Sequence, residues 1–216
     1  LSVKSACRIQ KEIKRTNRIF MIAQVIRFWP QYRKIRELVR SGAIGDIESV
    51  HAYRLGEAPP WATWFRRPEQ GGGALFDLHI HDVDFVYSLC GKPKSLFACG
   101  KRGEFGAWDA VTALWDWRDR HAVIRAEWTN PPGYPFRFGI RAKGVKGALE
   151  YRFQVAGNVE SLSSALEELT LSAQGREERL QCPEYRAGYE EEIRYFLECA
   201  QQRRPVEQAT IGEAVE

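Results

Sequence analysis

Five short runs with the composition of β-strands follow one another through the middle of the chain. They are SLFACGKR (95–102), DAVTALWDW (109–117), HAVIRAEW (121–128), FRFGIRAK (136–143) and GALEYRF (147–153). The links between them are short turns such as Arg118–Asp119 and Lys143–Gly144, whereas parallel neighbours need a crossover of about a dozen residues or more. Strands joined in this way predict a meandering antiparallel sheet, and this is the strongest constraint on the fold.

Helical patterns flank the sheet on both sides. Ser2 can cap a helix that ends near Thr16, Pro30 suits the first turn of a second helix closed by Gly42, and residues 75–90 and 186–203 are further helices. The last helix is expected to bury one stripe, namely Ile193, Phe196, Leu197 and Ala200. The apolar run at 19–28 and residues 46–55 are expected to be strands. This order of elements predicts an α+β fold.

The composition excludes several classes of protein. Of the 216 residues, 44% are hydrophobic, which is enough for a core, and the net charge of +4 is mild. The densest basic stretch, KEIKRTNR (11–18), fits the polar face of a helix, so no nucleic-acid partner is expected. No apolar run approaches the roughly 20 residues that span a bilayer, so no membrane partner is expected. Five cysteines without a C-x-x-C pair predict reduced thiols in the cytoplasm.

Both ends of the sequence look truncated. The chain has no starting Met, and Thr210 with Glu213 fits the capping box of a helix that opens just before the chain stops at Glu216. We therefore expect residues 1–216 to be a single domain cut from a longer protein.

The stretch GGGALFDLHIHDVDF (71–85) concentrates titratable residues in an apolar setting. On a helix with about 100° per residue, the apolar residues form two flanks that leave a polar line between them. The line consists of Asp77, His81, Asp84 and Ser88. Asp77 and Asp84 lie one turn before and one turn after His81, so both carboxylates can reach the imidazole. His79 and Asp82 are expected to point elsewhere.

This polar line has two interpretations. A histidine beside a carboxylate can act as a general base, with His81 taking a proton and Asp77 fixing its tautomer. The nearby helix N-terminus would keep the ring neutral at rest. A buried Asp–His pair is also a common core network in which the hydrogen bonds are merely satisfied. The glycines before it let the backbone pass close to a ligand or to another element.

A metal site is a third possibility, and it would make the protein a metal-dependent hydrolase. His79 and His81 form an H-x-H pair, which on a strand places two imidazoles on one face. On a helix the two rings diverge, and the chain has only His51 and His121 besides. We therefore expect no metal.

Three further residues are candidates for binding a substrate. Arg27 and Arg54 each end an expected strand, where a guanidinium can hold a hydroxyl or carboxylate, or form a surface ion pair. Trp64, with Trp61, precedes the glycines and can wall a sugar site or anchor the loop. The sequence contains neither a G-x-G-x-x-G nor a Walker motif, so no nucleotide site is expected in it.

The sequence resembles the Gfo/Idh/MocA oxidoreductases, the glucose–fructose oxidoreductase and inositol dehydrogenase family. Three segments carry the resemblance: MIAQVIRFWPQYRKIRELVRSGAIGDIESVHAYR (21–54), WFRRPEQGGGALFDLHIHDVDFVYSLCGKPKSL (64–96) and YEEEIRYFLECAQQRRPV (189–206). The middle segment is the most diagnostic, because the D-x-x-x-H of the family falls on Asp77 and His81. Many members have glycine where this chain has His79.

The resemblance implies a fold, an activity and an assembly. The fold would be an open-faced, mainly antiparallel sheet with helices on one side, following an N-terminal Rossmann domain that binds NAD or NADP. The activity would interconvert hydroxyl and carbonyl groups on a sugar, cyclitol or similar small molecule. His81 would be the acid/base, Asp77 would orient it, and Asp84 would support the pair. A homodimer or homotetramer would form through the sheet, with the tryptophan-rich strands at 108–128 as its surface.

The resemblance also implies what residues 1–216 lack. The Rossmann domain and the E-K-P motif of the family, whose lysine assists catalysis, are expected to lie before Leu1. The chain alone would then bind no NAD(P) and be inactive, and it reveals neither the substrate nor the choice between NAD and NADP. The alternative is a non-catalytic sugar-binding or oligomerisation module of the same fold.

Overall fold

The structure is a computed structural model that describes residues 2–58, 63–155, 165–184 and 187–216. Its contacts divide the chain into two compact units. One unit combines Leu1–Lys34 with Cys182–Glu216, and the other is Ile35–Gln181. The single domain expected over residues 1–216 stays a prediction. Within the described ranges, no helix is both long and apolar enough to span a bilayer.

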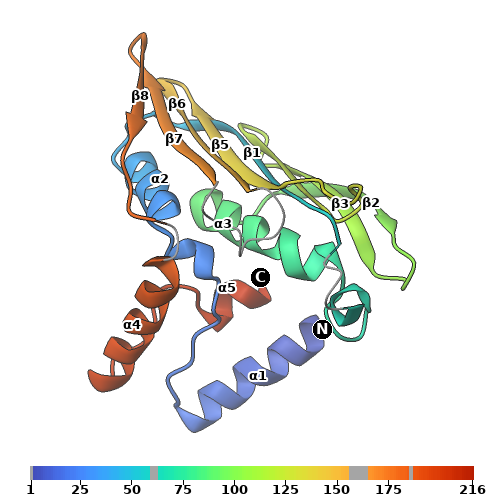
Figure 1. Cartoon of the computed structure of the whole chain (residues 1–216). Coiled ribbons are helices and arrows are strands. Elements are labelled where there is room, and N and C mark those ends of the chain that lie inside the picture. The colour runs from blue at the N-terminus through green and yellow to red at the C-terminus, as the bar shows by residue number, and fades with distance from the viewer. Residues whose placement is uncertain (1, 59–62, 156–164, 185–186) are drawn as a thin grey trace. The chain divides into compact units, whose positions relative to one another are not determined.

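The unit Ile35–Gln181 is built on an eight-stranded sheet (Figure 1). Its strands are β1 (Ile47–Leu55), β2 (Ser95–Arg102), β3 (Trp108–Asp116), β4 (His121–Glu127), β5 (Phe136–Gly144), β6 (Gly147–Val155), β7 (Leu166–Ala173) and β8 (Arg176–Leu180). The structure confirms the five strands predicted between residues 95 and 153 and the strand predicted at 46–55. Strands β7 and β8 were not predicted. The α+β class and the mainly antiparallel sheet are also confirmed.

The predicted meander is wrong at one point, between β4 and β5. The order across the sheet is β2-β3-β4-β1-β5-β6-β7-β8, so β1 lies between the two. It pairs parallel with β4, with Ser49 opposite His121, and antiparallel with β5. The link between β4 and β5, residues 128–135, contains three prolines, which oppose a tight hairpin and suit a link that crosses β1.

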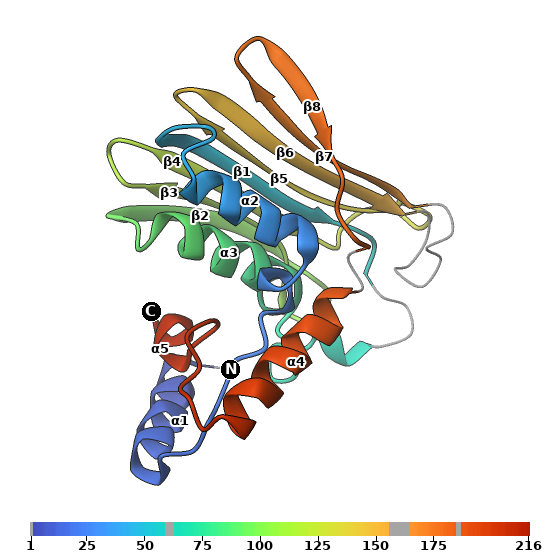
Figure 2. The same ribbon diagram turned by 90° about the vertical axis from the view of Figure 1, so that its left-hand side faces the viewer.

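Helices cover one face of this sheet. They are η2 (Thr63–Arg66), η3 (Leu75–His79), α3 (Ile80–Cys90) and the part of α2 (Pro30–Arg40) that begins at Ile35. Figure 2 shows α2 and α3 on the same side of the sheet, and strand residues that face them are buried, among them Val50, Ile124 and Ile140. Residues that alternate with these, such as His51 and Arg141, are exposed. The open face implied by the family resemblance is therefore present in this unit.

Three of the four tryptophans at 108–128 are buried in this unit, whereas Trp108 is half-buried. Trp115, Trp117 and Trp128 are 7%, 5% and 5% exposed. Trp128 packs against Ala74 and Leu78 of the helical layer. Because their side chains fill the core, these residues offer no surface for a partner copy.

The other unit is helical. It contains α1 (Val3–Thr16), η1 (Val25–Arg27), the start of α2, α4 (Ala187–Gln201) and α5 (Ile211–Val215). The side chain of Ser2 caps α1 as predicted, and α4 confirms the expected helix. Its predicted buried stripe is wrong, because Ile193 and Leu197 are 59% and 50% exposed while Gly188 and Cys199 are buried.

The strand predicted at 19–28 is also wrong. The run contains the single turn η1, preceded by Gln24 in the left-handed region at φ 50°. A short apolar run does not distinguish a strand from a buried turn by periodicity alone. Arg27 consequently lies in a turn and not at a strand end.

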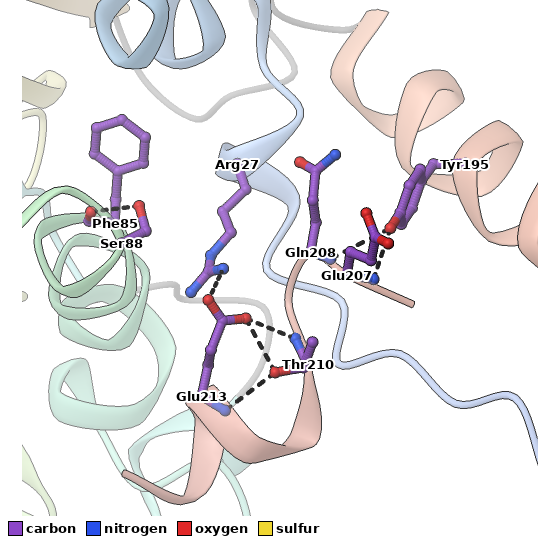
Figure 3. Close-up of polar contacts among 8 residues, drawn as sticks. All are labelled: Arg27, Phe85, Ser88, Tyr195, Glu207, Gln208, Thr210 and Glu213. Atoms are coloured by element: carbon purple, nitrogen blue, oxygen red, sulfur yellow. Dashed lines mark hydrogen bonds and ion pairs between the residues drawn. The ribbon is translucent and has the colours of Figure 1, made fainter. Parts of the chain in front are cut away.

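Arg27 is instead the buried anchor of the C-terminal helix (Figure 3). Its side chain is 2% exposed, and its Nη1 donates to Oε1 of Glu213 at 2.8 Å. Glu213 also completes the predicted capping box, accepting from the backbone N–H of Thr210 while the Thr210 hydroxyl accepts from the backbone of Glu213. The ion pair thus holds the first turn of α5 against η1.

Candidate active site

The glycines at 71–73 bring the chain close to its own strands. Gly73 has φ 75°, and a Cβ at this position would lie 2.6 Å from the backbone oxygen of Trp108. A Cβ at Gly71 would lie 2.4 Å from Cα of Phe65. Of the two uses expected for these glycines, the close approach to another element is the one observed. The carbonyl of Gly73 then accepts from the backbone N–H of Asp77 at 3.1 Å, which starts the helix.

The helix predicted at 75–90 is confirmed, but its first turn is wider than an α-helix. Leu75–His79 forms a π-helical turn, and the α-helical turns of α3 begin at Ile80. A π-turn contains one more residue than an α-turn, so the 100° spacing does not hold from Asp77 to His79. Such turns are frequent at functional sites, where they change the direction of a side chain.

Asp82 forms a buried ion pair that was not predicted from the sequence. It is 1% exposed and faces the sheet, where it meets Arg54 of β1. Arg54 Nε donates to Oδ2 of Asp82 and Nη2 donates to Oδ1, each at 3.2 Å. The signal was in the helical pattern, because Asp82 falls between Leu78 and Val86 on one apolar flank. A buried carboxylate there requires a cation opposite it.

His79 also faces the sheet, 4% exposed, with its Nε2 at 3.1 Å from the carbonyl oxygen of Ile124. Burial lowers the pKa of this ring, although its hydrogen bond to Ile124 opposes the shift. The described part of the chain contains no group of three or more His, Cys, Asp or Glu that could hold a metal ion. His79 therefore anchors the helix to β4.

His81 occupies the polar line as expected. The residue is half-buried and its Nδ1 is covered, with no hydrogen-bond partner among the described residues. Burial, and secondarily the charge of Arg54, lowers the pKa of this imidazole to about 3. The ring is thus neutral at neutral pH, as predicted, although burial is the main cause and not the helix N-terminus.

Asp77 and Asp84 are the two carboxylates of the predicted polar line. Asp77 is half-buried, and burial raises its pKa against the opposing charge of Arg54. Asp84 is buried, at 8% exposure. The Ser88 hydroxyl donates to the carbonyl of Phe85 at 2.7 Å (Figure 3). The described structure shows no hydrogen bond between Asp77 and His81, so the predicted interaction between the carboxylate and the imidazole is not formed.

The three candidate substrate-binding residues have different surroundings. Arg54 forms a buried ion pair with Asp82, and the buried Arg27 pairs with the partly exposed Glu213. Each arginine would have to leave its carboxylate before it could bind a substrate. Trp64 is 49% exposed and stacks on Phe65 with ring centroids 3.8 Å apart. It presents an aromatic face of the kind that sugars bind. Trp61 lies outside the described residues.

The fold and the buried Asp–His helix agree with the family resemblance, and comparison with known proteins establishes it. The family model described as the GFO/IDH/MocA C-terminal domain matches residues 32–158. The chain belongs to this family of oxidoreductases.

Individual relatives are similar over part of their length. The chain is 32% identical over 162 residues to 2,7-anhydro-N-acetylneuraminate hydratase of Escherichia coli K12, covering 71% of the chain and 43% of that protein. It is 32% identical over 106 residues to trans-1,2-dihydrobenzene-1,2-diol dehydrogenase of Macaca fuscata fuscata, covering 46% of the chain and 30% of that enzyme. The matched region is thus less than half of either relative.

Solved structures share the fold. A crystal structure of a putative NADPH-dependent oxidoreductase from Desulfitobacterium hafniense has a TM-score of 0.82 at 20% identity, covering 99% of this chain and 64% of that one. Levoglucosan dehydrogenase in complex with NADH and levoglucosan has a TM-score of 0.80 at 17% identity, covering 99% and 65%. The chain therefore spans about two thirds of the length of these oxidoreductases.

Proposed function

We propose that this chain is the substrate-binding part of an NAD(P)-dependent oxidoreductase that interconverts a hydroxyl and a carbonyl group on a sugar-like molecule. The observation that carries the proposal is His81, a half-buried neutral imidazole with an unpaired Nδ1, on the helix that the family model spans. A buried ring atom without a partner is costly in a core, and an active site is where such a cost is accepted.

In this proposal His81 carries the proton of the reaction. Oxidation of an alcohol removes a hydride from carbon and a proton from oxygen, and NAD(P) bound to the whole protein would supply the hydride acceptor. Neutral His81 takes that proton, and Asp77 stabilises the resulting imidazolium through Nδ1. Hydrogen bonds of this kind are often open in a protein without substrate and close when it binds. Trp64 supplies an aromatic wall for the sugar ring.

Within the described residues, the glycines at 71–73 do not form a phosphate-binding loop for a dinucleotide. The only run of consecutive glycines, at 71–73, faces Phe65 and Trp108 of the same unit and has no room to cradle a phosphate. We propose that NAD or NADP is bound by another part of the whole protein, a Rossmann domain that precedes these residues. The chain alone would then be inactive.

Replacement of His81 by alanine in the whole protein tests the assignment. We expect kcat to fall roughly 10²-fold or more with sugar and cyclitol substrates, because proton transfer contributes on this scale. His51→Ala is the matched control, since His51 is exposed on the open face of the sheet. A His81→Ala protein with native turnover would refute the role of His81. A non-catalytic binding module would bind a sugar equally well with and without the imidazole.

We also propose that the whole protein is a cytoplasmic homodimer or homotetramer assembled through the open face of the sheet. All five cysteines are free thiols, which suits a reducing compartment. The cross-strand pair Phe97 and Leu114, 67% and 44% exposed, alternates with buried Trp115 and so lies on the open face. Light scattering at micromolar concentration should give a dimer or tetramer, and Phe97→Lys should weaken it. A stable monomer would count against the assembly.

A further inference from the structure

Arg54 is joined to the helix by contacts at both its edge and its face. Two nearly parallel hydrogen bonds link its guanidinium edge to the Asp82 carboxylate, with side chains 4% and 1% exposed. The guanidinium carbon lies 4.6 Å from the centroid of the Phe138 ring, and Phe138 is the β5 residue opposite Arg54. Phe138 is itself stacked on Phe153 with centroids 4.5 Å apart. The guanidinium therefore has little freedom to move.

The contacts of Arg54 lie directly beside His81. Asp82 follows His81 in the chain, and His79 two positions before it contacts the carbonyl of Ile124. The turn that carries His81 is thus hydrogen-bonded to β1 through Asp82 and to β4 through His79. Because these contacts reach different strands, they oppose both rotation of the helix about its axis and its translation along that axis. The direction of the His81 ring follows from these contacts.

We propose that Arg54 is a positioning residue, which acts through Asp82 to hold the helical turn that presents His81. This inference rests on the proposed function of His81. It replaces a role in contacting the substrate, because the guanidinium is occupied by Asp82 and Phe138. In support, the charge of Arg54 adds to the burial that lowers the pKa of His81 and opposes the burial that raises the pKa of Asp77, so its charge acts on both residues.

The competing explanation is that the ion pair between Arg54 and Asp82 stabilises the fold without positioning His81. Two variants distinguish this explanation from the proposed role. Replacing the pair together, Arg54→Met with Asp82→Leu, leaves no unpaired buried charge, and such exchanges are often neutral for stability. Arg54→Lys keeps the charge but loses the two-pronged contact. Arg125→Met is the control, because Arg125 pairs with Glu127 at an exposed site on β4.

The experiment combines a kinetic measurement on the whole protein with an NMR measurement that does not depend on enzymatic activity. In the whole protein, we expect the double variant to lower kcat at least roughly tenfold with KM changed less than threefold, since small misplacements of a catalytic group have such effects. Arg54→Lys should recover only part of this loss, and Arg125→Met should lose nothing. In the chain alone, NMR of histidine side chains should show shifted or broadened ring signals of His81 in the double variant, with His51 and His121 unchanged.

The two arms distinguish a failure of the inference from a failure of the proposed function. A folded double variant with native kcat and native His81 ring signals would overturn the inference. A whole protein without oxidoreductase activity would instead overturn the proposed function, and the His81 ring signals would still decide whether Arg54 positions that ring.

Discussion

Gly73→Ala should destabilise the unit Ile35–Gln181 through two costs that the structure separates. The first is conformational, because alanine at φ 75° costs roughly 1–2 kcal/mol. The second is steric, because the new Cβ would lie 2.6 Å from the Trp108 oxygen and 2.9 Å from Cβ of Ala107. Overpacking of this kind costs roughly 1–3 kcal/mol. We expect a total loss of roughly 2–5 kcal/mol in the free energy of unfolding.

Gly42→Ala is the matched control for this prediction. Gly42 has nearly the same backbone angle, φ 76°, but nothing lies within 4 Å of an added Cβ. The free energy of unfolding of Gly42→Ala should therefore fall by the conformational cost alone. Both variants also stiffen the unfolded chain, and this stabilising contribution is the same in the two. Urea denaturation followed by tryptophan fluorescence measures both. If the two variants were equally destabilised, the close approach of Gly73 to β3 would not be a constraint on the sequence.

Three further predictions concern pH, core packing and the helical unit. The pKa of His81 lies at about 3 in the folded protein, below that of the unfolded chain. The free energy of unfolding should therefore be constant with respect to this group above about pH 6.5 and should fall as pH is lowered, because the unfolded chain binds a proton that the folded protein does not. In denaturation curves between pH 7 and 4, His81→Gln should reduce this slope by up to about one proton, or about 1.4 kcal/mol per pH unit. Phe138→Ala should cost roughly 3–5 kcal/mol in the same assay, whereas Val145→Ala, 58% exposed, should change stability by less than about 0.5 kcal/mol. Glu213→Gln should speed amide hydrogen exchange in α5, because it removes the charge that pairs with Arg27, and unchanged exchange would show that the pair does not hold this helix.

Strands β1 to β6 were predictable because each carries its own local pattern, whereas β7 and β8 were missed. Alternation and turn residues mark β2 to β6 in the local sequence, and the structure confirms them. The place of β1 between β4 and β5 carries no local signal, since it results from pairing between distant segments. The run at 19–28 was predicted wrongly because its apolar residues fit a strand as well as they fit the turn η1 that forms there. Local pattern therefore predicted the elements and missed their order.

The helix that carries the candidate site was predictable, whereas the roles of His81 and Asp77 stay predictions. The π-turn at Leu75–His79 was not, because no residue type marks it. The buried ion pair of Asp82 was not predicted, although the helical pattern placed this residue on an apolar flank. Its partner Arg54 lies 28 positions earlier on a strand, and only the folded sheet brings the two together.

The placement of β1 has a consequence for how this chain folds. The hairpins β2–β3–β4 and β5–β6–β7–β8 can each form from neighbouring segments, which is fast. Neither array touches the other except through β1, which is synthesised before both and pairs Ser49 with His121 and Ile47 with Gly144. The slow step should therefore be the closure of these two distant pairings around β1, which stays unpaired until both arrays are present. During that interval the backbone N–H and C=O groups of β1 are open to pairing with other chains, so this strand is expected to be prone to aggregation.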